Sequence, residues 1–235
     1  MDTTRVIGIE GVPTAGKSSL CNEISSRYEI CPEFARYAEE MPPYPSNRAE
    51  LRSQCEHALT CEKKRRNDYN DVSEPLLIMD SSPLATIGYI YITSTILEGD
   101  VLREFLQEYI KCIDRDEIFE PDAVVWLRPT YSTVSDRWEQ RGRDDFWSNS
   151  LVVKALDEMY EQICNYLPSV VIDSTTTPLN EEAEIVHQFV DDLNESTELY
   201  QRMYDNRDDV FDPPAELSGR KSLLRSQRTE WPTNS

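Results

Sequence analysis

The sequence is poor in metal-binding clusters and in long apolar segments. Its 235 residues include two histidines and six cysteines, and no two cysteines have the Cys-x-x-Cys spacing. We therefore expect no zinc site, and we expect reduced, mostly buried thiols. No apolar run approaches the ~20 residues that span a bilayer, and no leader peptide precedes the first apolar segment. These absences predict a cytoplasmic protein with no membrane partner.

Positive charge is also scarce, because 24 lysines and arginines face 44 aspartates and glutamates, for a net charge of −20. A field of this sign repels nucleic acid, so we expect no nucleic-acid partner. It also repels phosphorylated small molecules unless arginines reverse the potential locally. Clustered arginines are therefore candidates for a binding site.

Five short apolar segments alternate with helical patterns along the chain. This alternation predicts one α/β domain with a parallel sheet covered by helices on both faces and joined by right-handed crossovers. Residues 84–97 are ambiguous, because their β-branched residues favour a strand whereas a fully buried helix fits equally well. The expected strands are residues 5–10, 28–31, 76–80, 123–127 and 170–173, and the expected helices are residues 18–26, 50–67, 101–113, 131–141, 151–167 and a last one from about 180.

The periodic pattern weakens after about Asn194. We assign residues 1–194 to one domain and residues 195–235 to a C-terminal extension that is partly helical and then disordered from Leu217. One more charged segment, the run of four cations at residues 63–66, ends the second expected helix. A run of this kind is typical of a solvated helix face.

A phosphate-binding loop is the most specific motif in the chain. Residues 11–18 match GxxxxGK[ST] at every fixed position, after an expected strand and before an expected helix. Its glycines let backbone N–H groups turn toward phosphate oxygens, and the helix N-terminus adds a positive dipole end. Lys17 would reach the β- and γ-phosphates, and the Ser18 hydroxyl would ligate Mg²⁺. The predicted ATP-binding residues are Gly11, Val12, Pro13, Thr14, Ala15, Gly16, Lys17, Ser18 and Ser19.

Two missing motifs narrow the class of P-loop protein. The chain has no Asn-Lys-x-Asp segment, and Asp80 is followed by Ser81-Ser82-Pro83 rather than by an Asp-x-x-Gly pattern. These absences argue against a GTPase switch, and the small size without repeats argues against a motor or transporter. A small-molecule kinase that uses ATP and Mg²⁺ remains.

At this point the sequence resembles the thymidylate kinase and deoxynucleoside kinase group of P-loop kinases. Ile9-Glu10-Gly11 with the following Gly-Lys-Ser resembles the group's opening, and Pro32-Glu33-Phe34 resembles its strand-two glutamate. Asp80-Ser81-Ser82 resembles its strand-three D/E-R-S segment, residues 137–160 its arginine lid and following helix, and residues 171–173 its final strand. The resemblance implies a three-layer P-loop fold with a five-stranded parallel sheet and a short arginine-bearing lid.

The resemblance also implies the reaction, which is transfer of the γ-phosphate of ATP to a nucleoside or nucleoside monophosphate. Dimers are common in the group, so a homodimer is one arrangement that it allows. Glu33 would accept the proton of the attacking hydroxyl, the alternative being a solvated loop carboxylate. Asp80 would hold Mg²⁺ directly or through water, the alternative being a cap for the next helix.

The lid arginines would be Arg137, Arg141 and Arg143, which neutralise charge on the transferring phosphoryl group. The alternative is that they pair with neighbouring acidic residues on the surface. Glu33, Arg36 and Asp80 would contact the acceptor, with Arg48 and Arg52 as weaker candidates. Tyr89, Tyr91 and Trp138 would either stack on a base or pack in the core; His57 and His187 are expected to be structural.

One departure from the family pattern leaves the acceptor open. The group usually has an arginine after the strand-three acid, where this chain has Ser81. Arg36 or another arginine would have to take its place. Two alternatives therefore stand beside the nucleoside kinase: a kinase of another hydroxyl compound, such as an antibiotic, a sugar-like metabolite or a ribosylnicotinamide-type compound, and a regulatory module that binds ATP without transferring phosphate.

Overall fold

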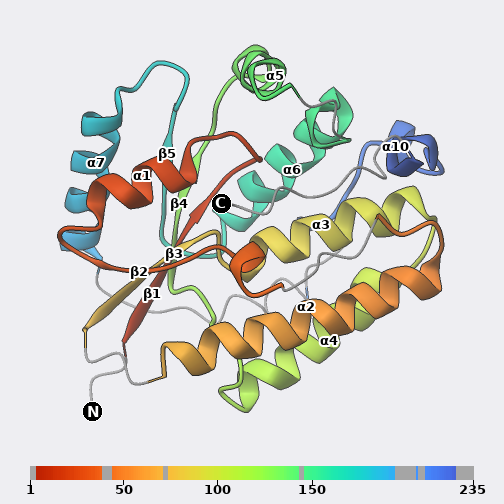
Figure 1. Cartoon of the computed structure of the whole chain (residues 1–235), viewed down its shortest axis with the longest axis horizontal. Helices are drawn as coiled ribbons and strands as arrows, with labels where there is room; N and C mark the ends of the chain where they lie inside the picture. The colour runs from red at the N-terminus through yellow and green to blue at the C-terminus, as the bar shows by residue number, and fades with distance from the viewer. Residues whose placement is uncertain are drawn as a thin grey trace.

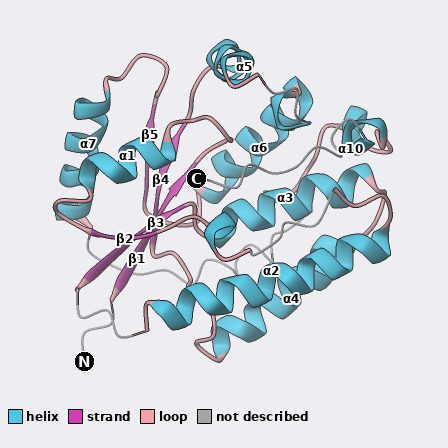
Figure 2. Ribbon diagram, viewed as in Figure 1, coloured by secondary structure: helices cyan, strands magenta, loops and turns pink. Residues whose placement is uncertain are grey.

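A five-stranded parallel sheet forms the centre of the molecule in the computed structural model, which describes residues 4–38, 44–70, 74–142, 146–193, 205 and 210–225. The strand order is β2-β3-β1-β4-β5, with every neighbouring pair parallel. Figure 2 shows the strands side by side between helices. Their bounds are β1 Arg5–Glu10, β2 Glu29–Cys31, β3 Leu76–Asp80, β4 Ala123–Leu127 and β5 Ser169–Ile172.

The central strands are apolar on both faces, as a sheet covered on both sides requires. All of β4 is buried, as are five of the six residues of β1. Ile9 of β1 lies opposite Asp80 of β3 on one side and Val125 of β4 on the other. The carboxyl ends of the three strands therefore lie together at one edge of the sheet.

Two groups of helices cover the two faces of the sheet (Figure 1). Helices α1 and α7 pack together on one face, and α2, α3, α4 and α6 cover the other, with α5 beyond the carboxyl ends of the strands. This arrangement confirms the predicted three-layer α/β fold. The bounds are α1 Lys17–Ile24, α2 Arg48–Asp68, α3 Pro83–Ile96, α4 Val101–Asp114, α5 Tyr131–Gln140, α6 Ser150–Ile163 and α7 Leu179–Asp192; short 3₁₀ turns are η1 Phe34–Arg36, η2 Phe146–Ser148 and η3 Ala215–Leu217.

Side-chain caps fix where several of these helices begin. The Asn47 side chain accepts hydrogen bonds from two backbone N–H groups at the start of α2. Ser82 caps α3 through the Leu84 N–H, and Pro83 occupies the first turn. These caps satisfy backbone donors that have no partner within the helix.

The ambiguous segment, residues 84–97, is helical, because it forms most of α3. Eleven residues of α3 are buried, so β-branched side chains line a helix that is apolar nearly all round. Gly88 faces α6, where an added Cβ would lie 3.0 Å from a Leu156 methyl carbon and 3.1 Å from the Met159 methyl carbon. Burial on several sides thus removes the periodicity that would have identified the helix.

The C-terminal extension differs from the sequence-based expectation. Residues 210–225 pack against the main body, and Leu217 is completely buried although disorder was expected from this position. The Phe211 ring lies 5.3 Å from that of Tyr91 on α3. Isolated apolar residues between polar ones carry no helical period, so the sequence pattern misses this contact. The expected helix near residues 199–204 and the tail after residue 225 lie outside the described residues.

Among the described residues, we find no helix that is both long enough and apolar enough to cross a membrane.

We expect Leu217→Ala to lower the free energy of unfolding by about 2–5 kcal/mol, because it removes a fully buried side chain and leaves a cavity. Chemical denaturation measures the change. Leu223→Ala is the matched control, since Leu223 is only partly buried and its truncation should cost less. Equal and small losses for both variants would show that the C-terminal segment does not add to the core.

Candidate functional site

The loop between β1 and α1 has the backbone of a phosphate cradle. Gly11, Thr14 and Gly16 have φ angles of 140°, 74° and 112°, which curl the loop back on itself. A Cβ on Gly11 would lie 2.4 Å from the Leu127 carbonyl oxygen at the end of β4, so only glycine fits there. Among the described residues, no side chain caps the N-terminus of α1, which leaves its N–H groups available to an anion.

Lys17 lies inside this loop, and no carboxylate of the described residues forms an ion pair with it. Its Nζ donates to the carbonyl oxygens of Gly11, at 2.9 Å, and Val12, at 3.2 Å. Burial lowers the pKa of Lys17, while Asp80, Glu10 and Glu33 oppose that shift. The ammonium is therefore the positive centre around which three carboxylates from different elements gather. Ser18 and Ser19 are exposed at the start of α1.

Asp80 ends β3 beside the phosphate loop. It is 7% exposed, and its Oδ1 atom has no hydrogen-bond partner among the described residues. Ser82 caps α3. The alternative considered for Asp80, that it caps this helix, is therefore wrong. A buried carboxylate oxygen without a partner carries a desolvation cost that a bound cation would offset.

Glu33 and Arg36 frame the other side of the site. Glu33 directly precedes the 3₁₀ turn η1, which contains Arg36. Burial raises the pKa of Glu33, Asp80 adds to the rise, and Lys17, Arg36 and Arg65 oppose it. The structure therefore brings Glu33, Asp80 and Lys17 within electrostatic range of one another, as the sequence predicts. The individual roles assigned to them stay predictions.

Glu10 is a site residue that the sequence analysis quoted only as part of a motif. Its side chain is completely buried; Oε1 accepts the Ser82 N–H at 2.6 Å, and Oε2 accepts the Tyr160 hydroxyl at 3.1 Å. Burial raises its pKa from 4.5 to about 7. Glu10 thus links the base of the phosphate loop to the β3–α3 turn and to α6. A carboxylate at the end of a buried apolar strand, directly before the phosphate loop, is the signal that could have identified it.

The arginine-bearing segment contributes one direct contact to the phosphate loop. Arg137 of α5 donates to the carbonyl oxygens of Thr14, at 2.9 Å, and Ala15, at 3.0 Å, and also to that of Ser174, at 2.9 Å. It therefore lies against the loop rather than pairing with a surface acid. Arg141 is exposed, with its guanidinium 6.0 Å from the Trp138 ring, and Arg143 lies outside the described residues.

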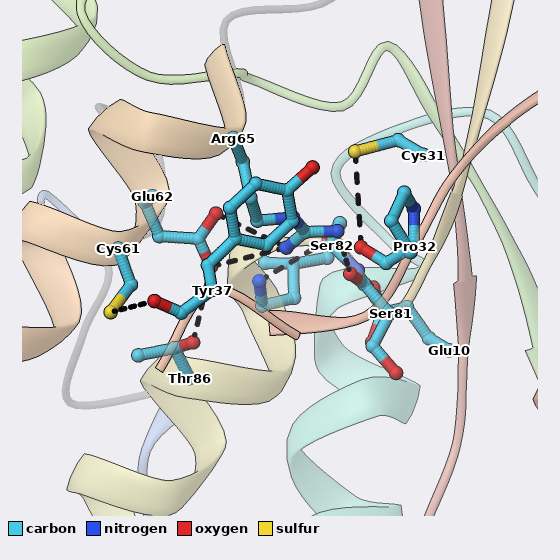
Figure 3. A network of polar contacts seen from close by, with 11 residues as sticks. Glu10, Cys31, Pro32, Tyr37, Cys61, Glu62, Arg65, Ser81, Ser82 and Thr86 are labelled. Carbon is cyan, nitrogen blue, oxygen red and sulfur yellow. Dashed lines mark hydrogen bonds and ion pairs between the residues drawn. The ribbon is translucent and has the colours of Figure 1, made fainter. Parts of the chain in front are cut away.

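The cation run at residues 63–66 contains the clearest correction to the sequence analysis. Arg65 is not on a solvated face: it is 0% exposed and pairs with Glu62, which is 1% exposed. Figure 3 shows Arg65 between Glu62 and Ser81, with Glu10 and Ser82 nearby. The reason is the helical period, because positions 62 and 65 share the α2 face with Leu51, Cys55 and Ala58. Lys63 and Arg66 form ion pairs with Glu117 and Asp116 instead.

Several weaker candidates contact other parts of the protein. Arg48 donates to the Glu98 carbonyl oxygen, and Arg52 pairs with Glu104 at 2.7 Å. Tyr91 and Trp138 are buried among apolar residues. His57 contacts Cys61, and His187 contacts Tyr28. These contacts agree with the structural role expected for both histidines.

The residues present fit a magnesium ion of the kind that P-loop enzymes use. Mg²⁺ prefers oxygen ligands and keeps several waters, so one hydroxyl and one carboxylate from the protein suffice. The exposed Ser18 hydroxyl and the Asp80 Oδ1 atom, which has no hydrogen-bond partner among the described residues, are the two candidate donors. No group of three or more potential metal-binding side chains occurs in the described part of the chain.

Several solved structures have a fold similar to that of this chain. Similar solved structures include the deoxyadenosine kinase from M. mycoides with the products dCMP and a flexible dCDP, which is 21% identical with a TM-score of 0.56. The match covers 80% of this chain and 100% of that one. The same enzyme with bound dATP matches at 20% identity and a TM-score of 0.55, over 79% of this chain and 99% of that one. No family model matches the sequence, and no curated protein does.

The similarity confirms the predicted resemblance to deoxynucleoside kinases at the level of the fold. Its low sequence identity carries no information about the acceptor.

We expect Glu10→Gln to stabilise the protein at high pH. Folding raises the pKa of Glu10 from 4.5 to about 7, so the native state keeps a proton that the unfolded chain has released, and wild-type stability falls as the pH rises through this window. The uncharged variant should gain up to about 3 kcal/mol at pH 8 and little near pH 5. Denaturant unfolding at both pH values measures the gain, with exposed Glu23→Gln as control. An equal gain in unfolding free energy at both pH values would contradict the raised pKa of Glu10.

Proposed function

We propose that the protein is an ATP- and magnesium-dependent phosphotransferase that moves the γ-phosphate of ATP to a hydroxyl of a nucleoside or nucleoside monophosphate. The observation that carries this proposal is the convergence of Lys17, Asp80 and Glu33 beside an uncapped helix N-terminus. An anion cradle with a nearby base is what phosphoryl transfer to a hydroxyl requires. A switch or motor would need the anion cradle but not the base that accepts a proton from a hydroxyl.

The chemistry follows from where these groups lie. The loop N–H groups and Lys17 bind the β- and γ-phosphates, and Arg137 holds the loop from α5. Mg²⁺, bound by Ser18 and Asp80, would neutralise the phosphate charge. Glu33 accepts the proton of the acceptor hydroxyl, and Arg36 on the following turn contacts the acceptor. Arg141 and Arg143 complete the lid when nucleotide is bound, which also keeps water out.

A cluster of aromatic residues from α3, from η2 and from the segment before α2 supports an acceptor that carries a base. The rings of Tyr44 and Phe146 lie 4.7 Å apart and edge-on, and those of Tyr89 and Trp147 lie 5.8 Å apart. The Tyr89 hydroxyl donates to the Gln54 amide oxygen at 2.7 Å. Flat rings beside a side-chain amide are the groups that stack on and hydrogen-bond a nucleobase. A sugar-like or antibiotic acceptor would not need this set.

Turnover with an acceptor panel tests the proposal. ATP consumption should rise with nucleosides or nucleoside monophosphates above the rate seen with ATP alone. Stimulation only by unrelated alcohols would instead support the other small-molecule kinase. ATP binding without stimulation by any compound would support the regulatory module and would sink the proposal.

We expect Lys17→Ala to lower phosphate transfer by about a hundredfold or more while leaving the fold intact. Among the described residues, the ammonium donates to the carbonyl groups of Gly11 and Val12, so its loss removes charge stabilisation of the transferring phosphate rather than a core contact. Steady-state rates and the thermal midpoint measure the two effects. Lys111→Ala, at a surface ion pair, is the control, and wild-type rates in Lys17→Ala would refute the assignment.

We expect Glu33→Gln to lower transfer by about 10²-fold or more with ATP affinity unchanged, because the amide cannot accept the proton. In the wild type, burial raises the pKa of Glu33. The acid limb of the kcat/KM profile should therefore lie above the usual glutamate range, since the base is lost as the pH falls through that pKa. Exposed Glu29→Gln on β2 is the matched control. Full activity in Glu33→Gln would rule out the base.

A further inference from the structure

The turn that follows β3 is an unusual piece of backbone for its sequence. Ser81 has a φ angle of 60°, in the left-handed region that a residue other than glycine rarely adopts. It is also only 7% exposed, so both of its backbone polar groups need partners inside the protein. The N–H donates to the Ile9 carbonyl oxygen of β1 at 3.1 Å. The carbonyl oxygen faces the other way, toward α2.

Arg65 of α2 is the partner for that carbonyl group. Its Nη2 donates to the Ser81 oxygen at 2.9 Å, and its Nη1 lies 3.1 Å and 3.2 Å from the two carboxylate oxygens of Glu62. Thr86 of α3 donates to Glu62 at 3.4 Å, so the ion pair is held from a third element. Figure 3 shows this chain of contacts running from α2 to the turn.

The same guanidinium acts on the phosphate site. Glu33 is surrounded by Asp80 at the end of β3, Lys17 at the start of α1, Arg36 on its own turn and Arg65 of α2. Arg65 is completely buried, whereas Lys17 is partly exposed and Arg36 is exposed. Arg65 keeps its charge because a guanidinium does not lose its proton in proteins. It opposes the rise in the pKa of Glu33.

We propose that Arg65 is a positioning residue of the phosphoryl-transfer site: it holds the Asp80–Ser82 turn from the α2 side and supplies the positive charge that Ser81 does not carry. The proposal rests on the function proposed above. Arg65 is 0% exposed, so we assign it to holding the turn rather than to contact with phosphate or acceptor. Through the Ser81 carbonyl oxygen it fixes the direction in which Asp80 leaves the strand, and it opposes the rise in the pKa of Glu33.

The test must separate this role from simple stability. Removing Arg65 alone would leave Glu62 buried and unpaired, which destabilises a protein strongly, whereas replacing both members of a buried pair by apolar residues of similar volume is often tolerated. We therefore use the double variant Glu62→Met/Arg65→Met. Its matched control is Asp116→Asn/Arg66→Met, which removes the neighbouring surface ion pair of α2.

The double variant should fold and should lose about tenfold to a hundredfold in kcat, as a displaced catalytic group does. Its acid limb should also move to higher pH than in the wild type, while the control pair leaves both unchanged. A folded double variant with the kcat and pH profile of the wild type would overturn the proposal.

A second variant covers the case in which the double variant does not fold. Arg65→Lys keeps the charge opposite Glu62 but cannot span both Glu62 and Ser81 in the way that the planar guanidinium does. It should lower kcat without moving the acid limb. Wild-type kcat in this variant would overturn the role in holding the turn.

A measurement without turnover separates this proposal from the proposed function. The pKa of the Glu33 carboxyl, followed by carbon-13 NMR in the free protein and assigned with Glu33→Gln, should be higher in the double variant, or in Arg65→Met if only that variant folds, than in the wild type. An unchanged value overturns the role of Arg65. If the wild type transfers no phosphate to any acceptor, the proposed function fails, while this titration still decides whether Arg65 acts on Glu33.

Discussion

The close approach of β1 and β3 at their carboxyl ends is the constraint on which the candidate site depends. Gly8 permits it, because a Cβ there would lie 2.9 Å from both the Glu10 Oε1 atom and the Ser82 Cβ. The Glu10 carboxyl occupies that space and accepts the Ser82 N–H. Since the phosphate loop leaves β1 immediately after Glu10, one buried carboxyl sets the spacing between the loop and the turn that carries Asp80.

The electrostatics of the site oppose those of the whole molecule. The chain has a net charge of −20, which would keep a triphosphate away from most of its surface. At the carboxyl ends of the strands, however, four elements bring cations together: Lys17 from α1, Arg36 from η1, Arg65 from α2 and Arg137 from α5. These cations lie among the carboxylates of Glu10, Glu33 and Asp80 and offset their negative charge locally, which favours an acidic ligand here over the rest of the surface.

Most of the fold could be predicted from the sequence because its signals are local. Each strand is a short apolar run, and the loop at residues 11–18 is bounded by one strand and one helix, so both follow from neighbouring residues alone. Residues 84–97 could not be assigned, because a helix buried on several sides has no polar face to mark its period. The packed segment at residues 210–225 was missed because a few apolar side chains, such as Leu217, find partners far away in the sequence.

The candidate site also contains residues that could be predicted from the sequence and one, Arg65, that could not. Lys17, Ser18, Glu33 and Asp80 are adjacent to strand ends, so the topology of a parallel sheet brings them together. Arg65 is different, because its burial depends on the length of α2 and on where the β3–α3 turn lies against it. The helical period places position 65 on the apolar face of α2, but it does not show that the Ser81 carbonyl oxygen lies there to accept a hydrogen bond.

All six cysteines are free thiols, and five of them, Cys21, Cys31, Cys55, Cys61 and Cys112, are buried. Burial raises the pKa of the Cys31 thiol to about 11 and that of the Cys55 thiol to about 12, so the native chain carries little reactive thiolate. Alkylation of these positions would then be gated by opening of the structure around them. These cysteines lie on α1, β2, α2 and α4. The alkylation rate of each thiol would therefore report how often the helix or strand around it opens, as hydrogen exchange does for backbone amides.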